Sequence, residues 1–145
     1  MITQCLCNSF RAELFQGVHN FSAVDGDVFK IALYTDIAQI GATTTAYTVT
    51  GEVLATGYTT GGEILTGQSI TVAQPETGPQ TYITFNNAEW TGTDIAARGA
   101  LIYNSSKSNK AVLVLNFGLD VSATNGVFTI TMPVAAPNTA LICFS

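Results

Sequence analysis

Hydrophobic and polar residues alternate along most of the chain after residue 27, which is the period-two pattern of β-strands. In the segment DVFKIALYT, Phe29, Ile31 and Leu33 share one face and the intervening residues share the other. Further segments of this character are GQSITVAQ, QTYITFNNAEW, GVFTITMP and TALICFS, with a loop marked by Pro75, Gly78 and Pro79. The pattern predicts about eight to ten short strands separated by turns, as in a sandwich or barrel.

The clearest hairpin has arms at residues 94–103 and 110–117, joined by the polar loop NSSKSN. Its second arm is apolar on both faces, and a strand of this kind is covered on both sides. The Thr-rich segment before residue 62 predicts further strand pieces near residues 47–50 and 53–58.

The first segment predicts the only helix of the chain, over residues 1–17, with Thr3 as its N-cap and Gly17 just past its end. Apolar residues recur there at every fourth position: Ile2, Leu6, Phe10 and Leu14. This stripe requires an apolar partner, which is either the chain's own sheet or a neighbouring subunit.

These patterns predict a mainly β protein, an antiparallel β-sandwich or barrel-like domain with one N-terminal α-helix. Residues 1–145 are expected to form a single domain, with the helix at 1–17 and the β-sandwich at 28–145. No internal repeat and no linker divides the sequence.

A stretch with four glycines, ATGYTTGGEILTG at residues 55–67, raises the question of phosphate binding. A phosphate loop needs a lysine after its last glycine, but Glu63 stands there instead. The segment from Glu63 to Gly67 is too short and too broken by glycine to begin the helix of a dinucleotide site. We therefore interpret Gly57, Gly61 and Gly62 as turn residues that bend the sheet.

Charged residues make up 10% of the chain, against about 25% in an average domain. Because interface cores are depleted in charge, this surface favours assembly with other protein, although a Thr-rich secreted domain has the same composition. The net charge is −5 without any basic run, which disfavours nucleic-acid binding. No apolar run approaches the ~18 residues of a membrane span, and the N-terminus lacks the features of a signal peptide. We expect folding in a cytoplasm.

Candidate catalytic and metal-binding residues are few. The single histidine, His19, is expected in a turn or at the surface, too isolated for a zinc site. The cysteines, at positions 5, 7 and 143, are expected to be small buried hydrophobes. Carboxylates pair as Asp25 with Asp27 and as Glu89 with Asp94, without the further ligands of a calcium loop. We expect no enzymatic activity, no cofactor and no metal.

Arg98 is the charged residue of an otherwise uncharged strand, IAARGALIYN. It either faces solvent, pairs with a carboxylate, or anchors a subunit contact, where arginine is enriched. Trp90 and Tyr103 are likewise core aromatics or interface anchors. The candidate interface residues are Leu6, Phe10, Leu14, Arg98 and Tyr103.

Four segments occur in a characteristic order over most of the chain: MITQCLCNSFRAELFQGVHNF, DVFKIALYT, ATGYTTGG and ARGALIYNSSKSNKAV. Together they resemble small virion structural proteins of tailed bacteriophages, and among these the capsid cement, or head-decoration, proteins of cyanobacterial phages. The resemblance implies a virion component, assembled in the host cytoplasm, that binds the outside of the phage head. We further expect a homodimer or homotrimer, formed through the helix or an apolar strand edge. Its partner would be the major capsid protein, whose subunit contacts it would stabilise.

Two alternatives stay open. The first is a tail, neck or baseplate structural protein, which differs from a head protein in its copy number. The second is a carbohydrate-binding β-sandwich, to which Trp90 and Tyr82 would contribute an aromatic platform.

Overall fold

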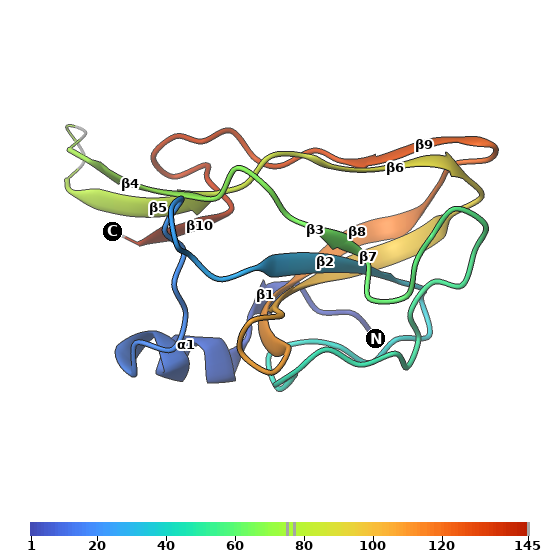
Figure 1. Cartoon of the computed structure of the whole chain (residues 1–145), viewed down its shortest axis with the longest axis horizontal. Helices are drawn as coiled ribbons and strands as arrows, with labels where there is room; N and C mark the ends of the chain where they lie inside the picture. Colours follow the sequence, from blue (N-terminus) through green and yellow to red (C-terminus); the bar gives the residue numbers. More distant parts are fainter. Residues whose placement is uncertain (75, 77, 145) are drawn as a thin grey trace.

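The computed structural model describes residues 1–74, 76 and 78–144, whose strands lie in two layers with the helix below one end (Figure 1). The elements are β1 (Cys5–Leu6), α1 (Asn8–Phe15), β2 (Phe29–Tyr34), β3 (Glu63–Ile64), β4 (Ser69–Ala73), β5 (Gln80–Thr84), β6 (Ala88–Thr93), β7 (Ala96–Asn104), β8 (Lys110–Ser122), β9 (Gly126–Ile130) and β10 (Ile142–Phe144). The chain is mainly β with antiparallel sheets and one N-terminal helix, which confirms the predicted fold class.

The lower layer is a five-stranded sheet in the order β1-β8-β7-β2-β3. Its centre is the predicted hairpin, in which β7 and β8 pair antiparallel from Asn104↔Lys110 outward. Residues 105–109 form the connection, where Ser108 and Asn109 take φ angles of 55° and 57°. All of β2, from Phe29 to Tyr34, pairs with the other edge of β7.

The upper layer consists of a three-stranded sheet, β10-β5-β4, and a two-stranded ribbon, β6-β9. β5 and β6 are consecutive along the chain, and so are β9 and β10, so the ribbon prolongs the sheet into one long layer (Figure 1). Of the predicted loop before β5, Gly78 and Pro79 lie outside any strand, while Pro75 lies outside the described residues.

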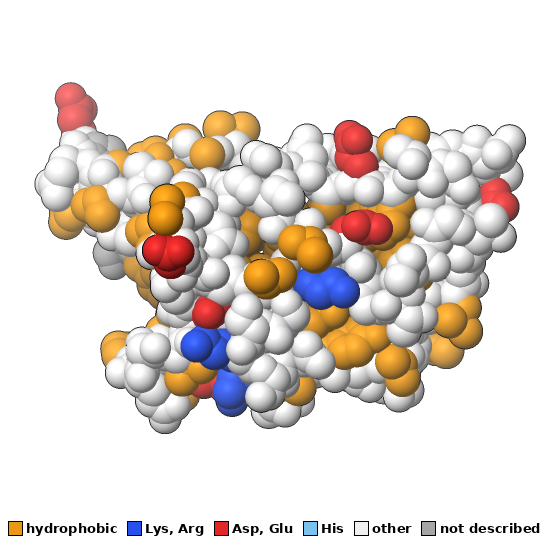
Figure 2. Space-filling model, in the orientation of Figure 1, with side chains coloured by type: hydrophobic (Ala, Val, Ile, Leu, Met, Phe, Trp, Pro, Cys, Tyr) orange, Lys and Arg blue, Asp and Glu red, His pale blue; other side chains and the backbone are white. Residues whose placement is uncertain are grey.

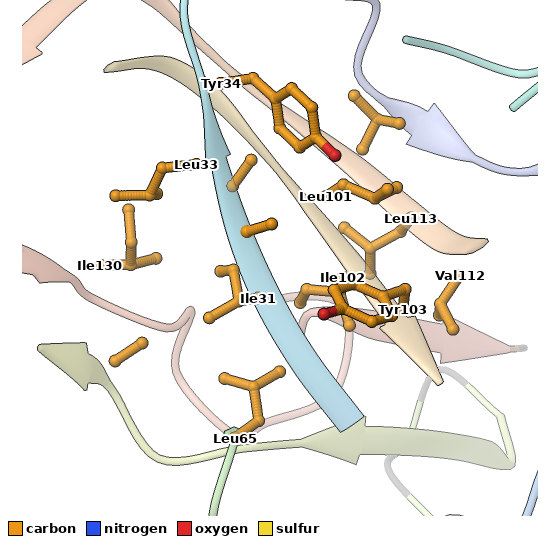
Figure 3. Packing of buried hydrophobic residues seen from close by; sticks show 14 of the residues in the cluster. Ile31, Leu33, Tyr34, Leu65, Leu101, Ile102, Tyr103, Val112, Leu113 and Ile130 are labelled. Atoms are coloured by element: carbon orange, nitrogen blue, oxygen red, sulfur yellow. The ribbon is translucent and has the colours of Figure 1, made fainter. Parts of the chain in front are cut away.

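The core lies on both faces of the central strands. Ile31 and Leu33 on β2 extend toward Ile130 of the upper layer, whereas Tyr34 and Tyr103 lie across the ribbon from them (Figure 3). All five side chains are at most 9% exposed. On β8 both faces are buried from Ala111 to Val114, whereas Leu115 and Phe117 are only partly buried, so the expected cover on both sides is confirmed for the first half of the predicted second arm.

An aromatic cluster joins the helix to both layers. Phe21 stacks on Phe29 of β2 with ring centroids 4.2 Å apart and meets the edge of Phe10 of α1 at 6.0 Å. Phe85, which comes directly after β5, closes on Phe29 at 5.7 Å. Such contacts stabilise a core beyond the area they bury. Of the predicted apolar stripe, Phe10 is thus covered by the chain's own core, whereas Leu14 is only partly buried.

The predicted start of the helix is wrong. Residues before Asn8 are extended: Ile2 forms a bridge with Ile40, and β1 pairs with β8 at Cys5↔Val114. Pairing with a strand more than a hundred positions away satisfies the backbone there, which local periodicity cannot reveal. The predicted end is correct, because Gly17 takes a φ of 66° just past the helix.

Residues 35–62 form a long irregular cover over the outer face of β2 and β7, and the strands predicted near 47–50 and 53–58 do not form. Glycines with positive φ, including Gly51 at 81° and Gly57 at 76°, interrupt any ladder. Gly62 is required for close approach, since a Cβ there would collide with the carbonyl oxygen of Ile31. The Gly-rich stretch is therefore a turn that leads into β3, as expected.

Within the described residues, no helix combines the length and the apolar character that crossing a membrane requires.

Replacing Phe10 by alanine should lower the free energy of unfolding by about 3–5 kcal/mol, because the ring is fully buried. The matched control is Phe15→Ala in the same helix, where a side chain 96% exposed is removed. Its effect should stay within about 0.5 kcal/mol. Urea denaturation followed by Trp90 fluorescence measures both, and equal effects would contradict the described orientation of the helix.

Candidate functional site: exposed apolar surface and buried polar clusters

The surface is sparsely charged and carries exposed hydrophobic side chains among its polar ones. Figure 2 shows one face on which hydrophobic side chains recur over both layers, while the charged ones are few and scattered. The large hydrophobic residues with exposed side chains are Met1, Phe15, Val24, Val28, Ile37, Val49, Leu54, Ile64, Ile70, Val72, Leu119, Val121, Val127, Val134 and Phe144. A contiguous exposed apolar surface, unlike single exposed side chains, is typical of sites that bind other macromolecules.

The five predicted interface residues divide into two groups. Phe10 is 0% and Tyr103 3% exposed, so neither side chain leaves a surface for a partner and both belong to the core. Leu6 and Leu14 are half-buried against that core. Arg98 donates from Nε to Asp120 at 2.7 Å, a solvated ion pair between β7 and β8 that contributes about 0–1 kcal/mol. Leu6, Leu14 and Arg98 remain candidates for an interface.

Other residues singled out in the sequence are structural. Trp90 is 2% exposed and packs against Phe128, which confirms its assignment to the core. All three cysteines are free. Cys7 is fully buried, and burial raises the pKa of its thiol to about 12. Cys5 and Cys143 are half-buried, so the prediction of buried cysteines is correct for Cys7 only.

His19 is the centre of a buried polar cluster, and its expected place at the surface is wrong. Its side chain is 0% exposed, because it lies against the aromatic rings of the helix face. Nε2 lies 2.7 Å from Glu13 Oε2, and Nδ1 lies 2.9 Å from Nδ2 of Asn104. Lys110 donates to the other oxygen of Glu13 at 2.7 Å. The cluster ties α1 to both strands of the central hairpin.

The bonds of Asn104 fix the tautomer of His19. Asn104 Nδ2 also donates to Asp27 Oδ2 at 2.7 Å, and its Oδ1 accepts from the backbone N–H of Ser106. The amide nitrogen therefore faces Nδ1, which must accept, so the proton lies on Nε2 and is donated to Glu13. Both ring nitrogens are engaged, which gives His19 a structural role.

The two carboxylates of the cluster stay ionised. Burial alone would raise the pKa of Glu13, but hydrogen bonds from Lys110 and His19 outweigh it and lower that pKa. The pKa of Asp27 is lowered in the same way: burial opposes the shift, whereas Asn104 and the N–H of Asn20 favour it. The acidic Asp25–Asp27 loop is thus part of a hydrogen-bonded cluster.

Glu52 forms a second buried cluster that the sequence pattern did not predict. The residue is 6% exposed, and its carboxylate accepts from Tyr47 Oη at 2.6 Å, from Tyr58 Oη at 2.7 Å and from the Gly61 N–H at 2.7 Å. The only signal in the sequence is one acid between two tyrosines of the Thr-rich segment. Three donors, rather than a cation, compensate this charge.

The tyrosines attach this cluster to the sheet. Leu33 N–H on β2 donates to Tyr58 Oη at 2.9 Å, and Tyr103 Oη on β7 donates to the Gly61 carbonyl at 2.7 Å. Burial raises the pKa values of Tyr47 and Tyr58, and the bond that each phenol donates to Glu52 raises them further. The cluster therefore fastens the irregular cover to the outer face of β2 and β7.

The remaining hollows are shallow. Two of about 250 Å³ and about 260 Å³ share Gln4, Leu115 and Leu141 beside β1, and one of about 320 Å³ lies beside Met1, Thr3 and Gln39. The first two are smaller than the ~300–1,000 Å³ of typical ligand pockets, and the third is at the lower end of that range. In the part of the chain that the structure describes, no three His, Cys, Asp or Glu side chains come together as metal ligands.

Comparisons of this chain with family models, with curated proteins and with solved structures found no match in any of the three.

Replacing Tyr58 by phenylalanine should destabilise the protein by about 1–3 kcal/mol at neutral pH, because Glu52 loses a donor and Leu33 N–H an acceptor. A phenol whose folded-state pKa is raised stabilises fully below about pH 10 and progressively less above it. The difference between wild type and variant should therefore narrow as the pH rises past about 10. Urea denaturation at several alkaline pH values measures this, and a constant difference would contradict the role of the phenol proton.

Glu13→Gln should also destabilise the protein at neutral pH, since it removes the charge that Lys110 and His19 share. A carboxylate with a lowered folded-state pKa contributes stability above the unfolded value of about 4.3 and loses it as the pH falls. The deficit of the variant should shrink in acid. Glu63→Gln, at an exposed position of β3, is the control and should have no such pH-dependent effect.

Proposed function

We propose that this chain is a viral structural protein, a capsid cement protein that binds the outside of a phage head and stabilises contacts between major capsid subunits. The observation that supports the proposal most is the exposed apolar surface, which is distributed over both layers and the helix of a sparsely charged protein. The resemblance of four sequence segments to such proteins supports the same function.

The buried clusters are consistent with a non-enzymatic role. Within the His19 cluster, and separately within the Glu52 cluster, the polar groups bond to one another. The residues best suited to acid–base chemistry therefore hold the fold together. What the protein offers to its surroundings is apolar side chains and open strand edges. Contiguous apolar patches and open strand edges are typical of surfaces that bind other proteins.

The mechanism depends on repetition. A symmetric homodimer or homotrimer presents one surface patch several times, and each copy grips a different capsid subunit. Once the first contact has formed, the second is intramolecular and gains from effective concentration. Individually weak apolar contacts then resist separation of the subunits under the pressure of packaged DNA.

The structure weakens the carbohydrate alternative. Tyr82 is 8% and Trp90 2% exposed, so neither ring is available to form a sugar-binding platform. A role in the tail, neck or baseplate uses the same kind of surface and is distinguished by its abundance in the particle.

Heads assembled without this protein should lose DNA at a lower temperature than heads to which the purified protein has been added back. The measurement is release of DNA on heating, monitored with a dye, with an unrelated small β protein as the control. Quantitative gels of washed particles give the copy number. Hundreds of copies per particle support the head assignment, whereas a few to some tens would support the tail, and equal heat resistance would refute the cement function.

A further inference from the structure

The outer edge of β4 is an open sheet edge. β4 pairs with β5 along Ser69↔Thr84 to Ala73↔Gln80 and closes the three-stranded sheet on that side. Among the described residues, no other backbone group bonds to residues 69–73. In Figure 1 this strand lies at the margin of the upper layer. A row of free N–H and C=O groups of this kind is a template for one more strand.

The side chains of β4 extend an apolar face beyond the core. Cross-strand register places Ile70 in a row with Ile83 and Ile142, and Val72 in a row with Thr81 and Phe144. Along the first row the exposed fraction falls from 50% at Ile70 to 5% and 2% at its two partners. In the second row, Val72 is 70% and Phe144 44% exposed. The core face of the sheet therefore continues outward without a cover.

Nothing in the sequence protects this edge. Natural edge strands are blunted by charges, prolines or bulges. From Gly67 to Gln74 the chain contains none of the charged residues and no proline, and β4 pairs with β5 without a register shift. Two copies of this chain, each with a net charge of −5, meet here without opposing like charges.

The sequence of β4 is close to a palindrome, Gln68-Ser69-Ile70-Thr71-Val72-Ala73-Gln74. In an antiparallel pair centred on Thr71, Ile70 lies opposite Val72 of a second copy, and Ser69 lies opposite its Ala73. β-branched residues meet on the apolar face and small ones on the other, which are favourable cross-strand pairs. Pairing of two identical strands about a two-fold axis requires a self-complementary sequence of this kind, whereas pairing with a strand of another protein does not.

We propose that β4 pairs antiparallel with β4 of a second copy about Thr71, joining two three-stranded sheets into one of six strands. The pairing satisfies the open edge and extends the apolar face across the two-fold axis. It identifies the surface that makes the oligomer of the cement hypothesis, but it rests on the geometry of the strand and is tested in the absence of capsids.

Val72→Lys tests the interface by charge. Val72 is 70% exposed, so a lysine at this position is solvated in the monomer. In the pair it lies close to the lysine of the second copy across the two-fold axis, and the two positive charges repel each other. Sedimentation equilibrium should show a wild-type dimer, with a dissociation constant raised at least about tenfold in the variant. The control is Val127→Lys, at a position 56% exposed on β9, which should leave the dimer intact.

Disulfide trapping tests the register. In a Cys5→Ser, Cys143→Ser background, Thr71→Cys places two thiols opposite each other at roughly 4.5–5.5 Å between Cβ atoms, and mild oxidation should link the copies. Ala73→Cys, on the same strand and face, separates the thiols by more than about 13 Å and should not link.

Three outcomes would overturn the pairing: a wild-type monomer at every concentration tested, a dimer unaffected by Val72→Lys, or equal linking by the two cysteine variants. A monomer whose binding to phage heads is abolished by Val72→Lys would assign the edge to a capsid strand instead. A dimer that ignores phage heads would support the pairing and refute the cement function.

Discussion

The central hairpin of β7 and β8 is apolar on both faces, and this requirement arranges much of the rest of the chain. Leu101 and Ile102 are neighbours on β7 whose side chains point to opposite faces, and both are fully buried, although the sheet to which they belong has only five strands and no helical layer of its own. One face is covered by the upper layer. The other must be covered by what remains, which is a short helix and 28 residues without regular structure, residues 35–62. A cover with so little secondary structure needs tethers.

The two buried carboxylate clusters are those tethers. Glu52 holds the irregular cover through phenols and one backbone N–H, and Glu13 holds the helix through Lys110 and His19. A buried ionised group is strongly destabilising if any partner is removed. Each cluster therefore fixes one position of its covering segment on the sheet. Apolar contacts alone would allow that segment to shift along the sheet. The titratable side chains of these two clusters therefore attach the covering segments to the sheet.

Period-two patterns predicted the elements that pack on a regular surface. β2 and the hairpin could be predicted from their apolar runs and the polar loop between the arms, because most side chains of β2 and β7 meet the core, although β8 continues to Ser122, beyond the predicted end at residue 117. β1 was missed because its conformation depends on Val114, far along the chain, and a four-residue stripe describes a helix equally well. Phe10 and Tyr103 were predicted at an interface because an apolar residue that needs a partner looks the same whether that partner is the chain's own core or a neighbour. The His19 cluster was missed because Asn104 lies 85 positions away.

The placement of the charges connects the interior to the surface. Glu13, Asp27 and Glu52 are held in hydrogen-bonded clusters inside the fold, and Lys110 is occupied by one of them. A chain with few charges to begin with thus keeps even fewer to protect its edges and keep it soluble. Exposed apolar side chains and an uncharged open strand are costly for a protein that stays alone, because they promote association. In an assembly such as the one we propose, the same features would be buried.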